Sequence, residues 1–178
     1  MNIFGRGVLG VTDRKVVRNL ITNTRPGRAL SRRFVAGETL EEAIAAASDL
    51  NARNAAVSLD HLGEHVTDRA QAEAARDDYL ACLDAIGDHA IDGNISVKLS
   101  QLGMGLDDDL AAESLDELAR SALEVGTTVS VDMEESAVTD LTIDIYSGAQ
   151  KAHGNLGLAV QAYLHRTPQD LDTIMPLG

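Results

Sequence analysis

The strongest constraint on the fold is a regular alternation of strand-like and helix-like segments from about residue 55 onward. Strand-like runs start near residues 56, 95, 128 and 158, and a helical pattern separates each run from the next. Strict alternation of this kind predicts a parallel sheet with right-handed crossovers, which is an α/β fold. The spacing of roughly 30 residues per unit is that of a (βα)8 TIM-type barrel.

The helical segments carry start and stop signals that fix their approximate ends. Thr39 and Glu42 form a capping-box pattern, and Gly154 is expected to end the helix that precedes it. We expect the acidic run at residues 107–109 to be a solvated helix start, not a metal site. Helices are predicted over four ranges: residues 39–52, 68–90, 111–126 and 138–153.

The four units account for residues 55–178, and residues 1–54 form a helical lead-in. The chain is therefore predicted to be a single partial domain with about four of the eight units of a barrel. A doubly wound open sheet is the alternative, and it would normally carry a Gly-rich turn after the first strand. That turn reads DHLGEH and has no G-x-G-x-x-G pattern.

Each predicted strand has one apolar and one polar face. The second strand sets Ile95, Val97 and Leu99 against Ser96, Lys98 and Ser100, and the fourth strand is expected to run through LGLAVQAYL. Because the helices need an apolar partner, the polar faces should point into the barrel. Four polar residues fall at or near the carboxyl ends of the strands, where barrel enzymes place their chemistry: Asp60, Lys98, Asp132 and Gln161.

Lys98 is the most informative of these residues. A buried, unpaired ammonium is costly, so Lys98 must find a carboxylate on Asp60, on Asp132 or on a ligand. It could be a hydrogen-bonded structural group, or the nucleophile of a Schiff-base aldolase. The residue pattern leaves these interpretations open.

Charge and composition narrow the class of partner. The net charge of −13 disfavours phosphate backbones and anionic lipid surfaces, so we expect no nucleic acid partner. The single cysteine, Cys82, is consistent with a reducing, cytoplasmic location.

HLGEH matches an inverted zinc-protease pattern, but Gly63 after a strand favours a loop, and we expect no metal. His89, His153 and His165 are expected at the surface.

Five stretches in order resemble the proline dehydrogenase family. They are RRFVAGETLEEA, LDHLGE, NISVKLSQLG, VDMEES and LAVQAYLHRT, and they cover the chain from about Arg32 to its end. The resemblance implies a (βα)8 barrel that holds FAD noncovalently and oxidises L-proline to 1-pyrroline-5-carboxylate. It also implies electron transfer to a quinone or another acceptor, with peripheral membrane contact for quinone reduction.

The resemblance assigns roles to individual residues. Lys98 matches the lysine that binds the substrate carboxylate, and Asp132 matches the catalytic aspartate that positions the substrate. Met133 and Gln161 match residues that contact the flavin, and Asp60 matches a supporting acidic residue. The flavin would accept the hydride while the protein binds and orients it.

Two departures from the family accompany the resemblance. Ser130 stands where many members have an arginine, and the chain ends before the family's fifth strand and its C-terminal arginine pair. We therefore expect the N-terminal half of such an enzyme, with little activity alone. An inactive fragment that acts only by assembly is the non-enzymatic alternative, and an aldolase using Lys98 is the enzymatic one.

Overall fold

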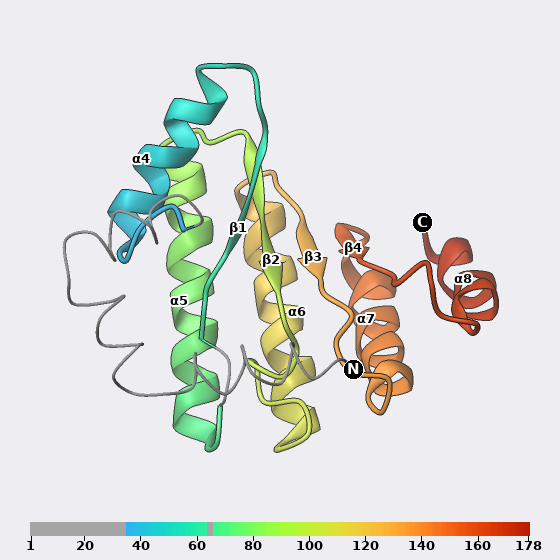
Figure 1. Ribbon diagram of the computed structural model, residues 1–178. Helices are drawn as coiled ribbons and strands as arrows, with labels where there is room; N and C mark the ends of the chain where they lie inside the picture. The colour runs from blue at the N-terminus through green and yellow to red at the C-terminus, as the bar shows by residue number, and fades with distance from the viewer. Residues whose placement is uncertain (1–34, 64–65) are drawn as a thin grey trace, which may run out of the picture. The chain divides into compact units, whose positions relative to one another are not determined.

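Four short parallel strands organise the fold, and helices cover one face of their sheet (Figure 1). The computed structural model describes residues 35–63 and 66–178. Its contacts divide the chain into two units, Met1–Ala46 and Ala47–Gly178. Of the first unit, residues 35–46 are described, and they contain the first turns of helix α4, Leu40–Asn51.

The start of α4 confirms the predicted capping box with one difference in its partners. The Glu42 backbone N–H donates to Thr39 Oγ1 at 3.3 Å, as expected. The Glu42 carboxylate accepts from the N–H of Glu38, at 2.8 Å, one residue before the position that the pattern predicts. The backbone N–H groups of Glu38 and Glu42 therefore both have side-chain acceptors at the helix start.

The second unit contains the alternating strands and helices in the predicted order. The strands pair in sequence, β1-β2-β3-β4, and all three pairings are parallel. The elements are β1 Val57–Asp60, α5 Arg69–Asp88, β2 Gly93–Val97, α6 Asp108–Glu124, β3 Val129–Val131, α7 Thr139–His153, β4 Leu156–Leu158, α8 Thr167–Ile174 and a final 3-10 turn, Met175–Leu177. Sequential order without a reversal favours a barrel segment over a doubly wound sheet, which reverses its strand order.

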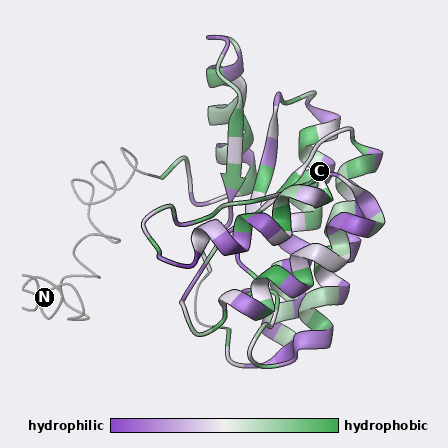
Figure 2. Cartoon of the chain, turned by 90° about the vertical axis from the view of Figure 1, so that its right-hand side faces the viewer, coloured by the Kyte–Doolittle hydropathy of each residue, from purple (hydrophilic) through white to green (hydrophobic). Residues whose placement is uncertain are grey.

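The apolar faces of the strands pack against the helices, as the alternation predicts. The helices carry bands of polar and apolar residues, which Figure 2 shows as alternating purple and green. The buried core of this unit combines strand and helix side chains: Ile95, Val97, Leu99, Val129, Val131, Leu83, Leu115 and Leu118. Removing this apolar surface from water is the main stabilising contribution, at about 25 cal/mol per Å².

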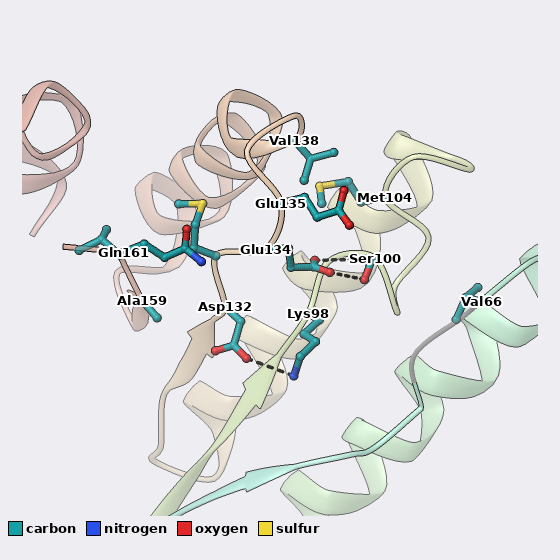
Figure 3. Close-up of a pocket in the computed structure, with 12 residues that line it drawn as sticks. Val66, Lys98, Ser100, Met104, Asp132, Glu134, Glu135, Val138, Ala159 and Gln161 are labelled. Atoms are coloured by element: carbon teal, nitrogen blue, oxygen red, sulfur yellow. Dashed lines mark hydrogen bonds and ion pairs between the residues drawn. The ribbon is translucent and has the colours of Figure 1, made fainter. Parts of the chain in front are cut away.

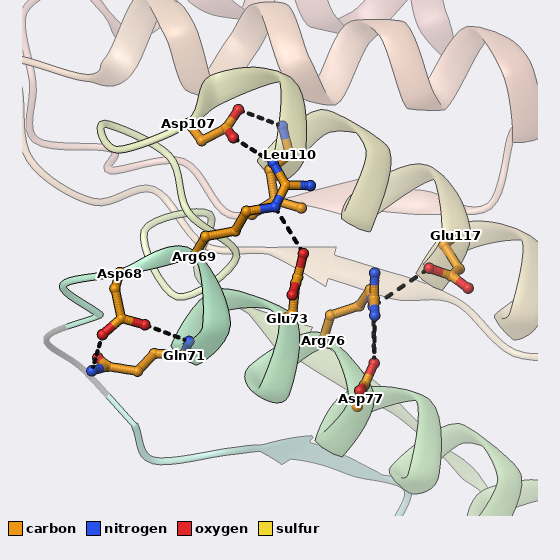
Figure 4. Close-up of polar contacts among 9 residues, drawn as sticks. All are labelled: Asp68, Arg69, Gln71, Glu73, Arg76, Asp77, Asp107, Leu110 and Glu117. Carbon is orange, nitrogen blue, oxygen red and sulfur yellow. Dashed lines mark hydrogen bonds and ion pairs between the residues drawn. The ribbon is translucent and has the colours of Figure 1, made fainter.

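The acidic run at residues 107–109 forms the start of α6. The Asp107 carboxylate accepts from the N–H of Leu110 at 3.1 Å, and Asp108 and Asp109 lie in the first turn. This placement confirms the predicted helix start. Figure 4 shows that Asp107 also pairs with Arg69 of α5 at 2.8 Å, so the cap joins two neighbouring helices.

Two expectations need correction. The fourth strand stops at Leu158 instead of continuing to Leu164, because the chain turns into α8, with the Leu164 N–H donating to the Gln161 carbonyl at 3.1 Å. His153 is only partly exposed at the surface: its side chain is 16% exposed, and Nε2 lies 2.6 Å from Asp116 Oδ1. Helix α6 begins at Asp108, within the acidic run expected to start it and three residues before the helical pattern at residue 111, because Asp107 caps it.

None of the described helices is both long and apolar enough to cross a membrane.

Candidate functional site

Lys98 lies between two carboxylates at the carboxyl edge of the sheet. Strand β1 ends at Asp60, while Lys98 and Asp132 each follow the last residue of β2 and β3. Because the three strands are parallel neighbours, these ends meet. Lys98 Nζ is 3.1 Å from Asp60 Oδ2 and 3.2 Å from Asp132 Oδ2. Three of the four polar residues predicted at the strand ends therefore form one cluster.

The two carboxylates set the charge state of Lys98. Burial lowers the pKa of this ammonium, but hydrogen bonds and charges from Asp60 and Asp132 outweigh burial and raise it. The side chains of Lys98, Asp60 and Asp132 are 20%, 34% and 32% exposed, so solvent weakens each pair. Lys98 is thus a fixed ammonium, whereas Schiff-base chemistry requires a neutral amine with a lowered pKa.

Asp132 is oriented from both sides. The Ser96 hydroxyl donates to Asp132 Oδ1 at 2.9 Å, while Lys98 holds Oδ2. The Asp132 backbone N–H also donates to the Val97 carbonyl at 2.9 Å, which extends the β2–β3 ladder past the strand end. Ser96 lies on the polar face that the alternation predicts, so its hydroxyl reaches the neighbouring strand.

Glu134 links two loops at the same edge. Its carboxylate accepts from the Ser100 backbone N–H at 3.0 Å and from the Ser100 hydroxyl. The loop after β2 and the loop after β3 are therefore joined beside Lys98 and Asp132, as the dashed lines in Figure 3 show. Glu134 was not among the residues predicted from the sequence, and its position two residues after Asp132 was the one signal that could have indicated it.

A cavity of about 630 Å³ opens beside this cluster. Ala159 and Gln161 lie on one side of it, and Met104 and Val66 lie on the other (Figure 3). Volumes of about 300–1,000 Å³ are typical of small-molecule sites that combine apolar walls with a few polar groups. The lining meets that description: Val66, Lys98, Ser100, Met104, Asp132, Met133, Glu134, Glu135, Val138, Ala159, Val160 and Gln161.

The residues predicted to contact a flavin both line this cavity. Met133 follows Asp132 directly, and Gln161 lies in the turn after β4 with its main chain held by Thr167 Oγ1 at 2.7 Å. A flavin ring needs an apolar surface and hydrogen-bonding groups along its edge. Met104, Met133 and Val160 supply the first, and the amide of Gln161 supplies the second. The residues present therefore fit the ring portion of FAD.

The remaining sequence motifs add no second site. Residues 61–63 lie outside any helix, and Glu64 and His65 fall outside the described residues, so the zinc-protease reading has no helical support. Within residues 35–63 and 66–178, no group of three or more His, Cys, Asp or Glu side chains could hold a metal.

A parallel sheet with sequential strand order and polar residues gathered at its carboxyl edge defines part of a (βα)-barrel protein of the TIM type. The sequence profile of the family described as "Proline dehydrogenase" matches residues 43–177. The chain belongs to the proline dehydrogenase family.

Individual relatives and solved structures agree with this assignment. The chain is 31% identical over 147 residues to "Proline dehydrogenase 1" of Bacillus subtilis subsp. natto, covering 83% of this chain and 49% of the relative. It is 31% identical to "Proline dehydrogenase" of Deinococcus radiodurans, covering 98% and 58%. The chain thus spans about half the length of the curated relatives it matches.

Two solved structures of proline utilization A (PutA) have the same fold over most of the chain. A mutant PutA of Bradyrhizobium japonicum superposes with a TM-score of 0.71 at 27% identity, covering 93% of this chain and 19% of that one. PutA of Bdellovibrio bacteriovorus has a TM-score of 0.77 at 19% identity, covering 85% and 19%. The predicted fold class is confirmed.

Proposed function

We propose that this chain carries part of the site for FAD-dependent oxidation of L-proline to 1-pyrroline-5-carboxylate in proline catabolism. Two electrons and two protons leave the substrate. The electrons pass to a quinone-type or other acceptor, and the protein acts in the cytoplasm with peripheral membrane contact where a quinone is used. The observation that carries this proposal is the cluster of Asp60, Lys98 and Asp132, of which Lys98 and Asp132 line the cavity.

Lys98 binds the substrate carboxylate. Its ammonium is permanently charged at neutral pH and lines the cavity, so a ligand carboxylate gains a charge-assisted hydrogen bond there. Asp60 and Asp132 keep the ammonium in place before the ligand arrives. Preorganisation of this kind reduces the cost of ordering the site on binding.

Asp132 positions the substrate, and Met133 and Gln161 hold the cofactor. Asp132 is fixed by Ser96 and Lys98, so its carboxylate presents a defined acceptor to the cavity. When bound, FAD would accept the hydride that proline loses. Met133 offers an apolar contact to its ring, and the Gln161 amide offers a hydrogen bond. Asp60 supports the network by pairing with Lys98.

Binding measurements on the purified chain test this proposal. Titration calorimetry should detect L-proline in the presence of FAD, and Lys98→Met should weaken binding at least about tenfold, because a charge-assisted hydrogen bond contributes about 1.5–3 kcal/mol. Lys151→Met, which alters an exposed lysine of α7, is the matched control and should bind normally. Equal affinities of wild type and Lys98→Met for L-proline would contradict the proposal.

A further inference from the structure

A buried hydrogen-bond network lies behind Asp60, on the side away from the cavity residue Lys98. The Tyr79 hydroxyl, on α5, is 2.8 Å from Gln101 Oε1 and 3.3 Å from Asp60 Oδ1. Tyr79 and Gln101 are only 1% and 2% exposed. Asp60 is therefore contacted by Tyr79 on one carboxylate oxygen and by Lys98 on the other.

The network leaves one hydroxyl hydrogen facing two acceptors. Gln101 Nε2 donates to the His61 carbonyl at 2.8 Å, so the Gln101 side-chain oxygen faces Tyr79 and accepts from it. Asp60 Oδ1 is a second, more distant acceptor for the same hydrogen. Burial and the Asp60 charge raise the pKa of Tyr79 far above its usual value, so the phenol keeps that hydrogen.

Asp60 needs this donor most when Lys98 is engaged elsewhere. In the ligand-free site, Lys98 balances the charge of Asp60 at 3.1 Å. A ligand carboxylate that draws Lys98 toward the cavity leaves Asp60 with less compensation, and a partly buried carboxylate that loses its cation is stabilised by another hydrogen-bond donor. Tyr79 is within reach to supply the missing hydrogen bond by rotating its hydroxyl from Gln101 to Asp60.

We propose that Tyr79 is a positioning residue that holds the Asp60 carboxylate against Lys98 and becomes the main donor to Asp60 when Lys98 turns to a ligand. The first part stands on the geometry alone. The second part rests on the proposed function. Tyr79 does not line the cavity, so it acts on the ligand through Asp60.

The competing explanation is that Tyr79 only fills space in the core. A second buried tyrosine of the chain provides a matched control. Tyr146 on α7 is 2% exposed, and burial also raises the pKa of its phenol. It lies outside the network that joins Asp60, Gln101 and Tyr79. Tyr146→Phe therefore removes the hydroxyl of a buried tyrosine without changing the contacts of Asp60.

Competitive labelling of lysines with acetic anhydride, read by mass spectrometry, tests the positioning role. Only the neutral amine reacts, so the rate for Lys98 reports how firmly the carboxylates hold its proton, and exposed Lys151 is an internal standard. Asp60→Asn should raise the Lys98 to Lys151 labelling ratio several-fold, and Tyr79→Phe should raise it in the same direction. The double variant should match Asp60→Asn, and Tyr146→Phe should match wild type.

Gln101→Met is the control for a general loosening of the site. It removes the competing acceptor, so Tyr79 donates to Asp60 alone and the labelling ratio should not rise. An unchanged ratio in Tyr79→Phe overturns the proposal. So does a further rise when Tyr79→Phe is added to Asp60→Asn, or a rise in Gln101→Met equal to that in Tyr79→Phe.

Ligand affinity separates this inference from the proposed function. Tyr79→Phe should weaken L-proline several-fold while leaving prolinamide, which lacks the carboxylate, unchanged. If wild type binds no L-proline while the labelling pattern holds, the proposed function fails and the positioning role of Tyr79 stands. If L-proline binds but the labelling pattern is absent, the positioning role fails and the proposed function stands.

Discussion

Lys98 has two carboxylates within 3.2 Å, and this arrangement separates the two enzymatic interpretations of the sequence. An ammonium with a raised pKa is a suitable anion-binding group and a poor nucleophile. Reduction with borohydride in the presence of pyruvate should therefore leave Lys98 unmodified relative to Lys151, as judged by peptide mass spectrometry. Selective modification of Lys98 would restore the Schiff-base alternative.

The same pKa shift predicts how the cluster contributes to stability. A lysine whose pKa is raised by folding stabilises the protein fully below its unfolded pKa of 10.5, and this contribution is lost as pH rises through the folded value. Lys98→Met should lower the free energy of unfolding by about 1–2 kcal/mol at pH 7, because it leaves Asp60 and Asp132 without their cation. The difference between the two proteins in urea unfolding should shrink above about pH 11. A gap of the same size above that pH would show that the lysine acts mainly through packing.

At the scale of elements, helix α7 offers two glycines with opposite expected effects. Gly154 ends the helix with a φ of 74°, whereas Gly148 lies within it, and an added Cβ would meet no atom within 4 Å at either position. Gly154→Ala should destabilise by about 1 kcal/mol, because L residues other than Asn and Asp rarely adopt positive φ. Gly148→Ala should stabilise by about 0.5–1 kcal/mol through helix propensity. Thermal unfolding of the two variants checks both signs, and a shift in the same direction would contradict the assigned helix end.

Arg166 joins the start of α8 to α7. Its guanidinium pairs with Asp170 at 2.8 Å and with Asp140 of α7, and the next residue, Thr167, donates its hydroxyl to the Gln161 carbonyl. Arg166→Ala should weaken FAD binding through displacement of that turn, with little effect on far-UV circular dichroism. Arg120→Ala, on the exposed side of α6, is the control. FAD affinity is measured by flavin fluorescence. Equal affinities of the two variants would show that Arg166 does not support FAD binding.

At the scale of the whole molecule, the net charge of −13 dominates long-range electrostatics. Added salt screens this self-repulsion, and the repulsion is spread over many more pairs than the few exposed ion pairs that salt also weakens. The melting temperature should therefore rise by a few degrees between about 20 mM and about 300 mM NaCl. A fall over this range would show that local ion pairs, such as Arg69 with Asp107, outweigh the overall repulsion.

Much of this architecture was predictable, because alternation along each strand is a local property. Parallel neighbours bring strand ends together, which was enough to place Asp60, Lys98 and Asp132 at one edge. The end of β4 was not predictable, since apolar Leu158 and Val160 continue the pattern while the Gln161 carbonyl accepts turn and side-chain hydrogen bonds instead. The contacts of Glu134 and Tyr79 also required three dimensions, because their partners lie 34 and 19–22 residues away.

The pairing of Glu134 with Ser100 has a consequence for the kind of molecule this cavity would select. The carboxylates of Asp132, Glu134 and Glu135 line the cavity, and Lys98 is the one cation among its described lining residues. Glu134 already accepts hydrogen bonds from Ser100, and Lys98 already pairs with the carboxylates of Asp60 and Asp132. A ligand that carries only negative charge is therefore repelled by the acidic lining. A zwitterion also carries a positive group, which the lining carboxylates can attract. Discrimination between small ligands would then depend on their charge pattern as much as on their ring size.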